Sequence, residues 1–180
     1  MATLISGSTG VNKITDGTIT NADIASGAAI AGSKLVMPAG SVLQVVNWRS
    51  TAYNTATTST SFVDTGVSIT ITPSSTSSKI LVVANLNGLY KYSANNIVST
   101  KLLRDSTDIG TIDSMNTYTD TTAHSVAGVS ISYLDSPNTS SAVTYKIQFK
   151  SADGSNVMIN ARWNSSNTTH STMTLMEIAG

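Results

Sequence analysis

Few side chains in this sequence have the chemistry of a catalyst, and those few lie far apart. The two histidines, His124 and His170, each stand beside serine or threonine, and the only glutamate, Glu177, is near the end of the chain. Two histidines could meet at a symmetry axis as a metal or pH-sensitive site, although a hydrogen-bonded surface histidine is more common. Glycoside hydrolysis needs two placed carboxylates, and Glu177 has no evident partner. We therefore predict that the protein is not an enzyme.

Metal and cofactor sites are also not expected. Asp105, Asp108 and Asp113 gather around one expected turn, but their spacing does not match an EF-hand loop, so an ordinary turn is favoured over calcium. Cysteine is absent, which removes disulfides and thiolate metal ligands. The many serines include no G-x-S-x-G nucleophile motif. The sequence thus predicts no cofactor and no metal.

Aromatic rings beside uncharged hydrogen-bonding groups indicate a different chemistry, the binding of a sugar. A ring can stack on the apolar face of a sugar while amides and hydroxyls bond to its OH groups. Three segments combine these residue types, and each aromatic could instead be an ordinary core or rim residue. The candidate ligand-binding residues are Trp48, Tyr53 and Asn54; Tyr90, Tyr92, Asn95 and Asn96; and Trp163 and Asn164, with Asn167.

The charge balance excludes two classes of partner. Ten Lys and Arg residues cancel ten Asp and Glu residues, so the formal net charge is zero. A nucleic-acid-binding domain usually carries a basic stripe, and steering to a polyanion or a membrane surface needs a strong field. The longest apolar run, residues 80–84, is too short to span a bilayer. We expect neither nucleic acid nor membrane insertion.

The start of the chain bears on where the protein assembles. MATLISGSTG lacks the basic region and the long apolar region of a secretory signal. We expect a soluble protein that assembles in a cell's cytoplasm and reaches any outside site without a signal peptide.

Residues 37–180 read as an all-β domain. Short segments alternate apolar and polar residues between turn signals, which predicts an antiparallel sandwich or barrel, and a jelly roll solves the problem of unpaired sheet edges. The pair Asp153-Gly154 predicts a hairpin. The expected strands are residues 41–48, 67–71, 80–84, 97–104, 129–133, 143–149, 157–163 and 172–178.

Two of these segments, residues 80–84 and 173–178, are apolar on both faces. One interpretation places them as central strands buried beneath loops. The alternative is that one of them faces neighbouring subunits around a symmetry axis, because apolar surface on both faces of a small sandwich often marks such a contact.

Residues 1–36 form a separate segment with an unusual period, and the boundary falls at Met37-Pro38-Ala39-Gly40. Apolar residues recur about every five positions, which suits neither a helix nor a strand. Three parallel chains could direct these side chains inward as a trimeric stalk; a disordered leader and a short helix after Asn21 are the alternatives. The stalk residues would be Ile14, Ile19, Ile24, Ile30 and Leu35.

The segment GTITNADIASGAAIAGSKL resembles the repeats and neck segments of bacteriophage tail-fibre proteins, especially those of marine phages. The later segments SFVDTGVSITITPSSTSSKILVVANLNG, STKLLRDSTDIG, SISYLDSPNTSSAVTYKIQFK and STMTLMEIAG are similar to distal domains of the same group. The resemblance implies a homotrimeric virion protein with a stalk and a head similar to the jelly roll of complement C1q and tumour necrosis factor.

The function implied by this resemblance is structural and adhesive. The N-terminal segment would dock to other virion proteins, and the head would present a host-surface attachment site, for which a glycan is the expected ligand. The chain is short and has one repeat block, so a capsid-decorating spike or cement protein is an alternative to a tail fibre. A monomeric lectin-like module with a flexible leader is a further alternative.

Overall fold

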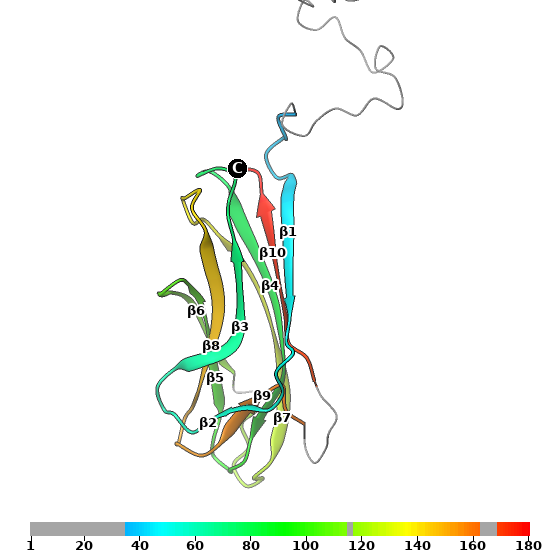
Figure 1. Ribbon diagram of the computed structural model, residues 1–180. Coiled ribbons are helices and arrows are strands. Elements are labelled where there is room, and N and C mark those ends of the chain that lie inside the picture. The colour runs from blue at the N-terminus through cyan, green and yellow to red at the C-terminus, as the bar shows by residue number, and fades with distance from the viewer. Residues whose placement is uncertain (1–34, 115–116, 163–168) are drawn as a thin grey trace, which may run out of the picture. The chain divides into compact units, whose positions relative to one another are not determined.

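The computed structural model describes residues 35–114, 117–162 and 169–180, and residues 37–180 form one unit (Figure 1). The predicted stalk residues Ile14, Ile19, Ile24 and Ile30, and the candidates Trp163, Asn164 and Asn167, lie outside the described residues. Leu35 is half exposed and precedes the first strand. The described strands are β1 (Val42–Arg49), β2 (Thr55–Thr57), β3 (Val63–Ile71), β4 (Lys79–Lys91), β5 (Val98–Arg104), β6 (Thr107–Ser114), β7 (Ser125–Asp135), β8 (Val143–Ser151), β9 (Val157–Ile159) and β10 (Thr172–Ile178).

These strands form two antiparallel sheets that pack face to face as a β-sandwich (Figure 1). In the first, sheet A, the long neighbours run β1-β10-β4-β7, and the short strands β9 and β2 extend from the end of β4. The second, sheet B, runs β3-β8-β5-β6. A six-stranded and a four-stranded antiparallel sheet packed face to face are a jelly-roll-like arrangement, so the all-β prediction is confirmed.

The core between the sheets follows from period-two patterning. In β8, the alternate residues Val143, Tyr145, Ile147 and Phe149 are buried, while the residues between them are partly exposed. In β10, Met173 and Leu175 point into the same core. Successive strand side chains point to opposite faces, so each sheet contributes one face to the core. Burial of these apolar side chains holds the layers together.

Three expectations about the strands were wrong. The expected loop after β1 contains the short strand β2, and the segment after the turn at Asp105 is the strand β6. The turn at Asp153-Gly154 is present, with Gly154 at φ +86°, but it does not make a hairpin. It connects β8 of sheet B to β9, which pairs with β2 and β4 of sheet A.

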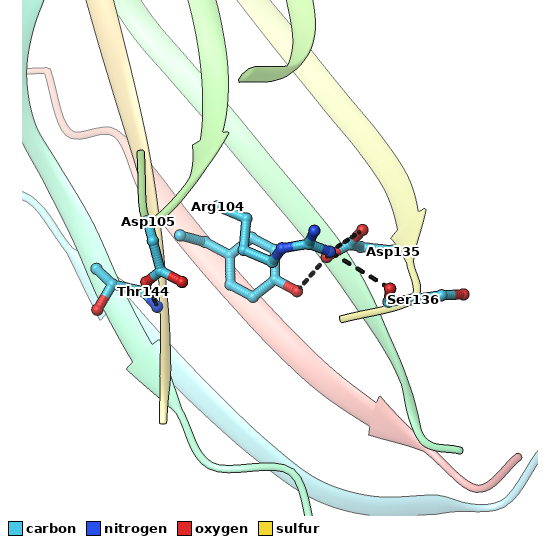
Figure 2. Close-up of polar contacts among 6 residues, drawn as sticks. Arg104, Asp105, Asp135, Ser136 and Thr144 are labelled. Carbon is cyan, nitrogen blue, oxygen red and sulfur yellow. Dashed lines mark hydrogen bonds and ion pairs between the residues drawn. The ribbon is translucent and has the colours of Figure 1, made fainter. Parts of the chain in front are cut away.

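A buried charged contact ties the two sheets together at the end of β7. The Arg104 guanidinium of β5 donates from Nη1 to both carboxylate oxygens of Asp135, at 2.9 and 2.8 Å, and Figure 2 shows this reach. The Tyr145 hydroxyl of β8 donates to Asp135 Oδ2 at 2.6 Å. Burial and the bond to Asp135 raise the pKa of Tyr145, so its hydroxyl stays a donor. Hydrogen bonds from charged groups are the stronger kind, so this contact fixes sheet A against sheet B.

A second buried carboxylate fixes the end of the sandwich at which β1 begins. Glu177 of β10 is fully buried and accepts hydrogen bonds from the Ser74 amide and hydroxyl (2.7 and 2.6 Å), the Ser78 hydroxyl (2.6 Å) and Gln44 Nε2 (2.5 Å). Burial by itself raises the pKa of Glu177, but these hydrogen bonds outweigh burial and lower it below 4.5. The C-terminus closes beside it, where the Gly40 amide donates to the Ala179 carbonyl at 2.8 Å.

This arrangement predicts a pH dependence of stability. The folded-state pKa of Glu177 is depressed, so its contribution to the free energy of unfolding is present above about pH 4.5 and is lost as the pH falls. Urea unfolding of the wild type and of Glu177→Gln should therefore differ most near neutral pH and converge toward pH 3. A difference that is constant across pH 3–7 would contradict an ionised Glu177.

Candidate functional site

The outer face of sheet A carries a row of apolar side chains. The cross-strand register places Val45 (β1) opposite Met176 (β10), Met176 opposite Leu81 (β4), and Leu81 opposite Leu134 (β7). Val45 and Leu134 are 55% and 51% exposed. Leu43 and Ile178 flank the row. We call this surface the open face of sheet A; it accounts for the doubly apolar segments 80–84 and 173–178, which are the adjacent central strands β4 and β10.

The open face becomes polar with distance from the start of β1. Two residues further along, Asn47 donates from Nδ2 to Thr174 Oγ1 at 2.7 Å. In the next outward-facing row of sheet A, Ser130 Oγ of β7 donates to Asn85 Oδ1 of β4 at 2.8 Å. These cross-strand bonds satisfy the polar groups at the middle of the sheet. The apolar part is therefore a bounded patch at the end where Gly40 enters.

The outer face of sheet B has the opposite character. One cross-strand row there consists of Asp64, Gln148, Lys101 and Thr111. Gln148 Nε2 donates to Asp64 Oδ1 at 2.8 Å, and Lys146 Nζ lies 3.3 Å from the same oxygen. Charged and hydrogen-bonded side chains are typical of a solvated face. The two outer faces of the sandwich therefore differ in chemical character: the outer face of sheet A carries an apolar row, and that of sheet B is charged.

An aromatic cluster lies at the other end of the sandwich, where β4 ends. Tyr90 and Tyr92 meet edge to face with ring centroids 4.6 Å apart, and Tyr90 Oη lies 2.5 Å from His124 Nδ1. Tyr92 Oη donates to Met158 Sδ at 3.7 Å. Tyr90 is buried, whereas Tyr92 is 39% exposed. Of the two tyrosines, Tyr92 offers the larger surface to a ligand. Because β4 has thirteen residues, this cluster is roughly 40 Å from the first residue of β4.

Lys91 organises the loop beside this cluster. Its side chain is fully buried, and Nζ donates to the Thr119 carbonyl (3.1 Å), Thr119 Oγ1 (2.5 Å) and the Thr122 carbonyl (3.4 Å). Burial lowers the pKa of Lys91, and the charges of Asp153 and Asp120 oppose that shift. An ammonium group that bridges two carbonyls of one loop holds that loop against β4.

The same loop brings Tyr118 to Asn95. Tyr118 is 43% exposed, and its hydroxyl donates to Asn95 Oδ1 at 3.2 Å. The Asn95 amide donates to the Thr119 carbonyl at 2.8 Å, and Asn95 adopts φ +56°. An exposed ring and an exposed carboxamide can together stack on a sugar and bond to its hydroxyl groups.

The other candidate ligand-binding residues are dispersed. Trp48 is half buried on the core side of β1. Tyr53 is 46% exposed and contacts His170 edge to face at 5.4 Å, and Asn54 beside it is exposed. Asn96 is fully buried, and its Oδ1 accepts bonds from the amides of Ile97 and Ala152. Its carboxamide thus shapes the turn after β4.

Sequence reasoning missed Tyr118, His124, Met158 and Lys91 as members of the cluster at the end of β4. The only sequence signal for these residues was that Tyr118 and His124 have aromatic side chains. Their proximity to Tyr90 depends on strand pairing, which a local sequence pattern does not reveal.

The described residues contain no group of three His, Cys, Asp or Glu side chains that could hold a metal ion. The two histidines have separate surroundings: His124 joins the aromatic cluster, and His170 Nδ1 lies 2.9 Å from the Ser50 carbonyl oxygen. Nor do the described residues include a helix long and apolar enough to cross a bilayer.

No protein-family model matches the chain, and no curated protein is significantly similar to it.

Replacing Lys91 with methionine, which has a similar length and no donor, should loosen the loop. The carbonyls of Thr119 and Thr122 would lose their common donor, so backbone amides of residues 117–122 should exchange with deuterium severalfold faster, while those of β10 keep their rates. Lys79→Met, at the exposed opposite end of β4, is the matched control. Unchanged exchange in Lys91→Met would show that the ammonium group does not hold the loop.

Proposed function

We propose that the protein is a structural virion protein of a bacteriophage, a short homotrimeric tail fibre or spike. Its residues 1–36 dock to other virion proteins as a stalk, and its sandwich is the head that attaches to a host-surface glycan. No catalytic step, cofactor or metal is part of this function.

The observation that carries the proposal is the apolar row on the open face of sheet A. Val45, Met176, Leu81 and Leu134 span four strands, and the corresponding surface of sheet B is charged. A soluble sandwich gains from burying such a patch, and a second copy of the same chain is always available to bury it. Self-association of the head is what a trimeric fibre requires.

The two ends of the sandwich support the attachment role. The chain enters at Gly40, at the end where β1 begins, while Tyr92, Tyr118 and Asn95 are exposed near the end of β4. A stalk joined at the first end leaves the second end available for a ligand. Three heads present three equal sites, so weak contacts with a sugar gain from multivalency.

Two alternative functions would each be indicated by a different experimental result. A trimer that labels the capsid shell of intact particles, rather than the tail, would be a decorating or cement protein. A monomer that binds a sugar would be a lectin-like module. The exposed rings of Tyr92 and Tyr118 favour this alternative, which does not depend on the open face.

Solution mass by light scattering tests the proposal. The full chain should have a mass of about 56 kDa, three times 18.7 kDa. Because the open face carries the assembly, a chain beginning at Met37 should remain trimeric. Val45→Asp places a charge in the apolar row and should shift the mass to 18.7 kDa, whereas Ser68→Asp, on the outer face of sheet B opposite Lys146, should stay trimeric.

A monomeric wild type at every concentration would overturn the fibre proposal. A trimer only in the full chain would assign assembly to residues 1–36 instead of the open face.

A further inference from the structure

A groove of about 260 Å³ opens between β6 of sheet B and β7 of sheet A. Its floor is apolar, because Leu102 of β5 and Ile131 of β7 are buried beneath it. Tyr133 stands at the rim and is 40% exposed. No charged side chain is among the described residues that line the groove; the remaining lining residues are Gly110, Ser130 and Ser132.

The groove is open on the side of β6 because Gly110 has no side chain there. Gly110 lies opposite the buried Leu102 in the pairing of β5 with β6, and a Cβ added at Gly110 would meet no atom within 4 Å. On β7, Tyr133 pairs with the core residue Val82, so its ring leaves the strand on the core side, whereas Leu134 points to the open face. The groove is therefore a surface separate from the apolar row.

Both strands that flank the groove are edge strands among the described residues. In sheet A, β7 pairs with β4 alone, and in sheet B, β6 pairs with β5 alone. An edge strand presents N–H and C=O groups that its own sheet does not bind. A ligand that covered these groups without hydrogen bonds would leave them buried and unsatisfied, which costs free energy. The groove thus requires a ligand with polar groups at its edge, which a hydrocarbon lacks.

Charge and size narrow the ligand further. A carboxylate or an ammonium group in this groove would lose water without gaining an opposite charge from the lining residues, so an uncharged ligand is favoured. Pockets for drug-sized ligands have volumes of about 300–1,000 Å³, and this groove is smaller, which suits one ring better than a length of polypeptide.

We infer that the groove binds one uncharged sugar ring. Such a ring has an apolar face, which matches the Tyr133 ring and the floor of Leu102 and Ile131, and hydroxyl groups around its edge, which match the backbone groups of β6 and β7. The inference rests on the proposed attachment to a glycan and names the class of that glycan as neutral. It also gives each head a second sugar subsite: Tyr133 is seven residues along β7 from Val126, the partner of Tyr90, which is roughly 20 Å.

The groove can be filled without disturbing the fold. Gly110→Val adds a side chain where a Cβ has room, Gly110 is not among the glycines with positive φ, and valine suits an extended strand better than glycine. The variant should therefore unfold in urea at the same or a higher concentration than the wild type. Thr111→Val is the matched control, because Thr111 is exposed and pairs with Lys101 on the outer face of sheet B.

The test is a titration of the full-length protein, with isotope-labelled Ile and Leu methyl groups, followed by NMR. The probes are the methyl pyranosides of glucose, galactose, mannose and N-acetylglucosamine, and methyl glucuronide as the acidic counterpart of the glucoside. At least one neutral pyranoside should shift the methyl signals of Ile131 and Leu102 saturably. Gly110→Val and Tyr133→Ala should weaken this response at least tenfold, whereas Thr111→Val and Tyr118→Ala should leave it unchanged.

Three results would overturn the inference: no response of these methyl groups to any neutral pyranoside, a full response in Gly110→Val, or a glucuronide that binds as tightly as the glucoside. An uncharged tripeptide capped at both ends, titrated in parallel, would assign the groove to a polypeptide if it alone moved these signals. A trimer without a sugar response in the groove would leave the fibre proposal standing. A monomeric wild type would overturn the fibre proposal, and the methyl signals would still decide the groove.

Discussion

Sheet A presents apolar side chains on both of its faces, and the assembly that we propose depends on that constraint. Its central strands β10 and β4 alternate between core residues such as Leu175 and Val82 and open-face residues such as Met176 and Leu81. Packing against sheet B satisfies only one set. The other set remains at the surface of a single copy, and its burial would be the energetic reason for the self-association that we propose.

Two buried carboxylates hold together the strands that carry this surface. Asp135 joins Arg104 and Tyr145 of sheet B to the end of β7, and Glu177 joins β10 to Gln44 and to the loop before β4. Each is buried with its hydrogen bonds made, so neither is an uncompensated charge. Both lie next to open-face residues: Asp135 follows Leu134, and Glu177 lies between Met176 and Ile178. The contacts that close the core therefore also position the apolar row.

The sequence was sufficient to predict the strands with clean alternation, such as β8, because burial on one face imposes a period of two. It did not predict β6, since Asp108 and Gly110 are poor strand residues and only pairing with β5 makes them extended. It also gave a false hairpin at Gly154, because a local turn signal cannot tell whether the next strand joins the same sheet. The sequence marked Leu81 and Met176 as part of segments that are apolar on both faces, but not their alignment with Val45 and Leu134. That alignment and the contact of Tyr90 with His124 depend on the register of strands distant in sequence. The buried role of Asn96 was hidden for the same reason.

In the assembly that we propose, a second copy of the chain covers the open face of sheet A, and cysteine labelling can detect this cover. The chain has no cysteine, so Val45→Cys and Ser68→Cys each carry a single thiol at a position that is exposed in one copy. We predict that maleimide reacts at least tenfold more slowly with the native Val45→Cys protein than with native Ser68→Cys, and that unfolding in urea equalises the two rates. Equal, rapid labelling of both native proteins would contradict it.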